Sequence, residues 1–145
     1  MYTFLWRSAP YPAMTIFDFP DSNVTCTRRS RSNTPLQSLT LANDQAFVEF
    51  AQGLAARILK EASPDDTERL RYAFRLCLTR EPKPAESQRL AALLEQQKTE
   101  FKAAPKEAEQ LAPALLALKT DSQEFAAWTA VARVLLNLDE FITRE

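Results

Sequence analysis

The chain of 145 residues contains no histidine and a single glycine, Gly53. Without histidine it cannot supply Ser-His-Asp or Cys-His catalysis, a histidine-ligated zinc ion or a C-x-x-C-H haem attachment. Without glycine-rich turns it cannot form a P-loop or a G-x-G-x-x-G dinucleotide-binding turn. We therefore expect no catalytic residue, no cofactor and no metal site in this chain.

An excess of charge of either sign is also lacking. The 18 basic and 19 acidic residues leave a net charge of −1, whereas nucleic-acid and anionic-membrane binders usually carry a marked basic excess. Nucleic acid is accordingly not an expected partner. The longest nearly uncharged run, residues 125–138, contains Arg133 and is shorter than the roughly 20 residues that a membrane-spanning helix needs.

Cysteine is scarce as well. Cys26 and Cys77 lie far apart in the sequence and match no metal-ligand spacing, which leaves one disulfide or two free thiols. The helical pattern around Cys77 places it on a buried face, where a reduced cysteine packs as a small hydrophobic side chain. This placement favours free thiols.

Residues 1–33 are predicted to form an extended N-terminal arm. Prolines recur at Pro10, Pro12 and Pro20, and no helical period is visible. Six exposed aromatic rings so close together would make an adhesive patch, so we expect the rings to pack on the helices. The aromatic residues of the arm are Tyr2, Phe4, Trp6, Tyr11, Phe17 and Phe19.

Residues 34–145 are predicted to form one helical bundle, because apolar residues three and four apart follow each helix-start signal. The first signal combines an N-cap at Thr34, proline at the first helical position and Gln37 at the capping-box position. Further starts are predicted at Asn43-Asp44, at Ser63-Pro64-Asp65-Asp66, at Pro84, after Pro105 and at Asp121-Ser122-Gln123-Glu124. Ser63-Pro64 repeats the start chemistry of Thr34-Pro35, and the segment from Asp121 to Glu124 is a second capping-box pattern.

The segment from Phe125 to Leu136 is apolar on nearly all sides, with Arg133 as its one charged residue. A helix of this kind is usually surrounded by others, so we place it at the centre of the bundle. Leu111, Leu115 and Leu118 indicate a short helix before it. The predicted fold is therefore all-α, with about five or six helices and an extended aromatic and proline-rich arm.

Arg28, Arg29 and Arg31 are the candidate binding residues. Guanidinium groups pair bidentately with phosphate, sulfate or carboxylate, but they also solvate loops or pair with acidic helix surfaces, and the slightly acidic chain favours this structural interpretation. Paired acids occur at Asp18 with Asp21, Asp65 with Asp66, and Asp139 with Glu140, and they are interpreted as structural rather than catalytic. Helix ends explain Asp65 with Asp66 and Asp139 with Glu140.

Two blocks, residues 2–44 and 126–141, resemble part of a known domain of unknown function. That domain stands at the C-terminal end of the large planctomycete-type cytochrome c-like proteins, and the resemblance is to its C-terminal part. The most specific words are NTPLQ at 33–37 and LNLDEF at 136–141, while residues 63–120 match only in helical pattern. The family often has proline where this chain has Gln45. The resemblance implies a fragment of a larger exported protein and supplies no established activity.

We expect the chain to act as a non-catalytic structural or interaction module. It would pack against an upstream domain of the same protein, or an acidic protein partner, with Arg28, Arg29 and Arg31 at the interface. Two alternatives remain open. One is a carbohydrate- or sulfate-processing site completed by the upstream domain, and the other is weak oligonucleotide binding through the basic, aromatic arm.

Overall fold

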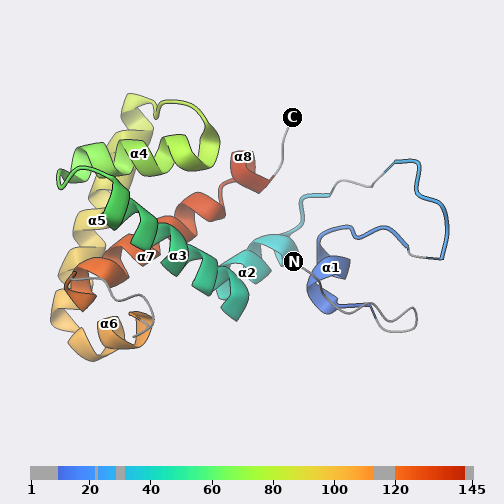
Figure 1. Cartoon of the computed structure of the whole chain (residues 1–145), viewed down its shortest axis with the longest axis horizontal. Coiled ribbons are helices and arrows are strands. Elements are labelled where there is room, and N and C mark those ends of the chain that lie inside the picture. The colour runs from blue at the N-terminus through green and yellow to red at the C-terminus, as the bar shows by residue number, and fades with distance from the viewer. Residues whose placement is uncertain (1–9, 22, 29–31, 113–119, 143–145) are drawn as a thin grey trace.

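The computed structural model describes residues 10–21, 23–28, 32–112 and 120–142 (Figure 1). These residues form eight helices and no strand, which confirms the all-α fold. The number exceeds five or six because α1 and α8 are single turns. The helices are α1 (Pro12–Ile16), α2 (Pro35–Asn43), α3 (Gln45–Glu61), α4 (Asp66–Leu78), α5 (Pro84–Ala103), α6 (Pro105–Leu111), α7 (Ser122–Leu136) and α8 (Asp139–Ile142).

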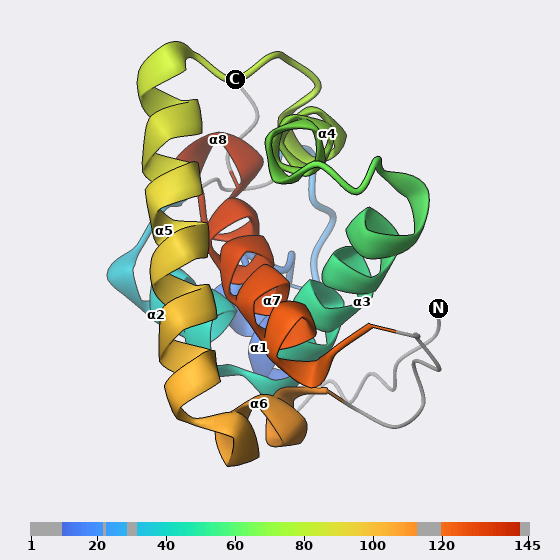
Figure 2. The same cartoon turned by 90° about the vertical axis from the view of Figure 1, so that its left-hand side faces the viewer.

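Helix α7 lies at the centre of the bundle, as its sequence predicts. It contacts α3, α5 and α6 most extensively, and Figure 2 shows it enclosed between α3 and α5 with α4 across one end. Trp128 in its middle is fully buried. The side chains buried in the surrounding core include Ile58, Leu70, Phe74, Leu90, Leu94, Phe125, Val131 and Leu135.

Most helix starts follow from local chemistry. Thr34 Oγ1 accepts the Gln37 backbone N–H at 3.3 Å while Gln37 Oε1 accepts the Thr34 N–H at 3.1 Å, which confirms the capping box. Asp44 caps α3 by accepting the Ala46 N–H at 2.9 Å. Pro84 opens α5, and α6 begins at Pro105 after α5 has ended at Ala103.

Two predicted starts are wrong in detail. Helix α4 begins at Asp66 rather than after Ser63, because Asp65 accepts the Glu68 N–H at 2.9 Å and provides the N-cap itself. Asp121 is the N-cap residue of α7, but its side chain makes no capping hydrogen bond. The predicted capping box fails because the Glu124 carboxylate binds Arg69 of α4 at 2.7 Å instead.

The arm is not extended throughout, since α1 forms a turn of helix inside it. Pro12 stands in the first turn, where its fixed φ suits a helix and its missing N–H costs nothing. One predicted contact of the arm is present: the Phe17 ring packs against Phe47 of α3, with centroids 5.7 Å apart. Tyr11 is 42% exposed, whereas Tyr2, Phe4 and Trp6 lie outside the described residues.

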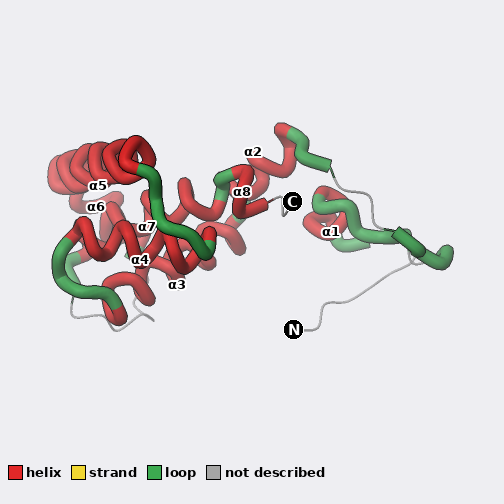
Figure 3. Tube along the Cα trace, turned by 90° about the horizontal axis from the view of Figure 1, so that it is seen from above, coloured by secondary structure: helices red, strands yellow, loops and turns green. Residues whose placement is uncertain are grey.

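The described part of the arm lies beyond one end of the bundle, and α2 forms the connection between them (Figures 1 and 3). Both cysteines are free, as expected: Cys26 is exposed on the arm, and Cys77 is half-buried on α4. Burial raises the pKa of the Cys77 thiol to about 11, so this thiol stays protonated at neutral pH. The predicted helix with Leu115 and Leu118 falls outside the described residues.

Candidate functional site

Arg28 is the one predicted site arginine that lies within the described residues; Arg29 and Arg31 fall outside them. Its side chain is exposed at an open groove of about 430 Å³ formed by the arm itself. Asp18 and Asp21 line the same groove. The arrangement therefore brings an arginine and two carboxylates to one concave surface.

Both carboxylates of this groove already have backbone partners. Asp18 Oδ2 accepts the N–H and the hydroxyl of Ser32, each at 2.7 Å. Asp21 Oδ1 accepts the backbone N–H and the side-chain amide of Asn23, each at 2.9 Å. These bonds order the loops of the arm, as the structural interpretation of the acidic pairs requires.

Gln37 joins the arm to the bundle, a role that the sequence analysis missed. It is 2% exposed, and its Nε2 group donates to the Ile16 carbonyl at 2.9 Å and to Ser32 Oγ at 3.0 Å. The signal was present in the residue type: a capping box accepts either Glu or Gln, but only Gln has two N–H donors to spare. Gln37 therefore satisfies the helix end and the arm together.

The two specific sequence words, although about a hundred residues apart, meet beside Gln37. The Asn33 side-chain amide donates to Asp139 Oδ1, and the Ser38 hydroxyl donates to Asn137 Oδ1 at 3.1 Å. Asn137 in turn donates to the Ser38 carbonyl at 3.4 Å. The first turn of α2 is thus fixed to the segment between α7 and α8. We call Asn33, Gln37, Ser38, Asn137 and Asp139 the arm junction.

The described residues bring together no group of three or more His, Cys, Asp or Glu side chains that could hold a metal ion. Among the helices of that same part of the chain, none combines the length and the apolar character needed to cross a bilayer.

Comparison with known protein families matches residues 1–94 to PSD1, which is described as a protein of unknown function (DUF1553). The chain belongs to the PSD1 family. The match contains the arm, the NTPLQ word and helices α2 to α4, whereas the LNLDEF word lies beyond it. The predicted resemblance is therefore confirmed as membership of a family of unknown function. No curated protein and no solved structure matches the chain.

Besides the groove of the arm, the PSD1 chain has a charged cluster around Arg80 that holds helix α8 in place. The Arg80 guanidinium lies between two carboxylates, with Nη2 at 2.8 Å from Glu86 Oε1 and 2.6 Å from Glu140 Oε2. It also stands over the Phe74 ring, 4.8 Å from the centroid. Glu140 was interpreted from sequence only as part of a helix boundary. Its contact with Arg80 connects α8 to the start of α5.

Acid is expected to release this Arg80 cluster. The hydrogen bonds from Arg80 lower the pKa of Glu86 from 4.5 to about 2, and they also lower the pKa of Glu140. The stabilisation is therefore complete above about pH 4.5 and is lost as the pH falls through about 2. We expect the melting temperature to fall as the pH is lowered from about 4.5 to about 2. In Glu86→Gln the melting temperature should depend less steeply on pH over the same range.

The matched control for that measurement is Glu109→Gln, at an exposed glutamate of α6. Thermal unfolding followed by circular dichroism from about pH 5 to about pH 2 gives the comparison. A Glu86→Gln curve with the slope of the parent protein would contradict the role assigned to the Arg80 cluster.

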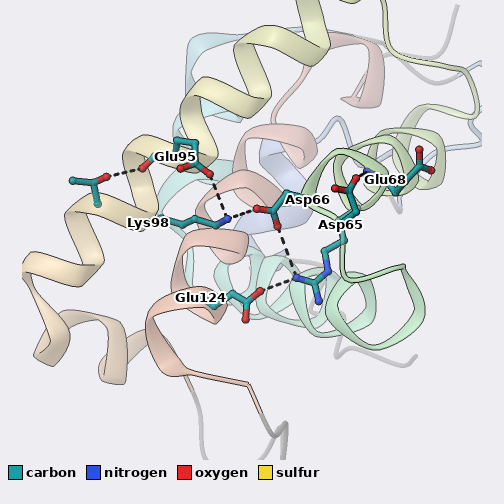
Figure 4. Close-up of polar contacts among 8 residues, drawn as sticks. Asp65, Asp66, Glu68, Glu95, Lys98 and Glu124 are labelled. Atoms are coloured by element: carbon teal, nitrogen blue, oxygen red, sulfur yellow. Dashed lines mark hydrogen bonds and ion pairs between the residues drawn. The ribbon is translucent and has the colours of Figure 1, made fainter.

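A third cluster explains the acidic start of α4 in this PSD1 chain (Figure 4). Asp66 accepts a hydrogen bond from Lys98 of α5 and lies 3.9 Å from Arg69, whose Nη1 binds Glu124 of α7 at 2.7 Å. The chain of charges links α4, α5 and α7. Because each carboxylate is paired with a cation, this cluster fits a structural role better than acid–base catalysis.

Proposed function

We propose that the chain is a non-catalytic structural or interaction module of a larger exported protein, of the planctomycete-type cytochrome c-like class. In this proposal the arm and α2 dock an upstream domain of the same protein. Membership of a family without assigned activity supports the proposal. So does the engagement of the groove carboxylates Asp18 and Asp21 in backbone hydrogen bonds.

The observation that carries the proposal is the apolar surface of α2. Leu36 and Leu39 are 56% and 59% exposed, and residues three apart on a helix share one side. Phe50 of α3 is 52% exposed and packs edge-on against Phe47, which continues the aromatic contact with Phe17. Large side chains of this kind on neighbouring elements mark an interaction surface.

The proposed occupant is an apolar surface with acidic residues at its edge. Arg28 supplies the complementary charge on the arm, and Arg29 and Arg31 follow it in the sequence. Charge at the edge of an interface chiefly sets association rate and specificity, while buried apolar side chains supply most of the affinity. The leucines of α2 should therefore matter more for affinity than Arg28.

We expect Leu39→Ser to weaken this docking by about ten- to a hundredfold, since burying one leucine contributes about 1.5–3 kcal/mol. The measurement uses the intact natural protein with a photo-reactive phenylalanine analogue at position 36, at position 39, or at position 89 on the polar face of α5. Positions 36 and 39 are expected to cross-link to the upstream domain. Leu39→Ser is expected to remove the cross-link formed from position 36.

Position 89 serves as the control, because Arg89 is exposed on α5. Cross-linking there at the level seen for positions 36 and 39 would contradict a docking surface on α2. Hydrolytic or redox activity of the purified 145-residue chain would overturn the proposal as a whole.

A further inference from the structure

The half-buried guanidinium of Arg133 has few hydrogen-bond partners among the described residues. Arg133 is the one charged residue between Phe125 and Leu136, and it is half-buried in the central helix. One Nη2–H donates to the Ala42 carbonyl in the last turn of α2, where the helix dipole favours a cation. The Nε atom is buried without a hydrogen-bond partner among the described atoms. A C-capping role therefore accounts for only one of five N–H donors.

The charge of Arg133 is also uncompensated within the described part of the chain. The ion pairs formed there involve Arg57, Arg69, Arg71, Arg75, Arg80 and Lys98, and none includes Arg133. Removing a guanidinium from water without a counter-ion is costly. An anion that reaches this group would recover part of that cost.

A groove of about 280 Å³ lies beside this guanidinium, between α2, α5 and α7. Leu93 of α5 and Ala130 and Val134 of α7 line it with apolar atoms, and Val134 is 40% exposed, so the groove is open to solvent. This lining suits a hydrocarbon body rather than a hydrated inorganic ion.

The two amides that line the same groove are already engaged. Gln97 Nε2 donates to Glu100 at 2.6 Å, and Asn137 Nδ2 donates to the Ser38 carbonyl at 3.4 Å. Arg133 is consequently the lining side chain that carries a positive charge and has donors to spare.

We propose that this groove binds a small organic carboxylate, with the anionic head on Arg133 and a short apolar body against Leu93, Ala130 and Val134. The planar guanidinium matches a carboxylate bidentately. The volume lies at the lower end of the range for ligand pockets, which begins at roughly 300 Å³, and this suits a small ligand. This site goes beyond the proposed docking role, because it lies outside the arm and the leucine face of α2.

Titration of the ¹⁵N-labelled chain with hexanoate tests the site. Backbone amide shifts at Ala42, Val134 and Asn137 should saturate with a Kd of about 1 mM, which is typical of a ligand of so few atoms. Acetate carries the charge without the body, and hexylamine carries the body with the opposite charge. Both should bind at least about tenfold more weakly if head and body act together.

Two variants separate charge from packing. Arg133→Met keeps the apolar stem and should weaken hexanoate binding at least about tenfold, whereas Arg133→Lys should retain part of it. Should Arg133→Met disturb α2, Val134→Ala provides the second variant: it trims the exposed wall and should weaken hexanoate several-fold while leaving acetate unchanged. Equal binding of hexylamine and hexanoate, or unchanged hexanoate affinity in both Arg133→Met and Val134→Ala, would overturn the proposal.

Discussion

Trp128→Ala is expected to lower the free energy of unfolding by about 3–5 kcal/mol. The side chain is 0% exposed in the middle of α7, and the core around it is built from α3, α4 and α5. Removing the ring leaves a cavity that these helices cannot all close at once, because α7 contacts them from several sides. A domain of this size has about 5–15 kcal/mol in total, so the loss is a large share of its stability.

Trp128→Phe is the matched control for this cavity. The indole Nε1 is buried without a hydrogen-bond partner among the described atoms. Phenylalanine removes that unsatisfied donor along with part of the ring, so its cost should stay near about 1–2 kcal/mol. Urea denaturation followed by far-ultraviolet circular dichroism measures both variants. An alanine variant as stable as the phenylalanine variant would show that α7 is not the centre of the core.

Gln37→Glu is expected to destabilise the chain by about 2–3 kcal/mol even though it preserves the capping box. A carboxylate at this position still accepts the Thr34 N–H. It cannot donate to the Ile16 carbonyl or to Ser32 Oγ, and it places a buried charge 2.9 Å from a carbonyl oxygen. The arm should detach before the bundle unfolds.

Thr34→Ala isolates the capping contribution, because it removes the hydroxyl that accepts the Gln37 N–H and leaves Gln37 Nε2 intact. Its cost should be about 0.5–2 kcal/mol without release of the arm. Limited proteolysis reports release through faster cleavage between residues 17 and 33, and urea denaturation gives the stability. Equal cleavage rates in the parent protein and in Gln37→Glu would refute the function of Gln37 in holding the arm.

The sequence predicts those parts of the fold that depend on nearest neighbours. Thr34 and Asp44 mark helix starts because capping joins atoms only two or three residues apart, and Pro84 marks one because its fixed φ suits the first helical position. The central place of α7 follows from its apolar surface, which must be buried on several sides. The partner of Glu124 could not be predicted, because its ion pair with Arg69 spans 55 residues and replaces the local capping-box bond at the start of α7.

The candidate site was predictable only in part, for the same reason. Arg28 was identified by its residue type and reaches a groove, but the carboxylates beside it serve the loops of the arm. Partners such as Asn33 with Asp139 and Arg80 with Glu140 depend on which helix ends meet in space. Residue type limits what each of these side chains can bind, whereas tertiary packing selects the partner.

The arm junction has a consequence for the order in which the chain is made and folded. Its bonds from Asn33 to Asp139 and from Ser38 to Asn137 span 106 and 99 residues, and the bond from Arg133 to Ala42, which also joins α2 to α7, spans 91. Contacts of such separation form late, because a long loop must close before they stabilise anything. The start of α2 is therefore secured only after residues about a hundred positions further along the chain have been synthesised.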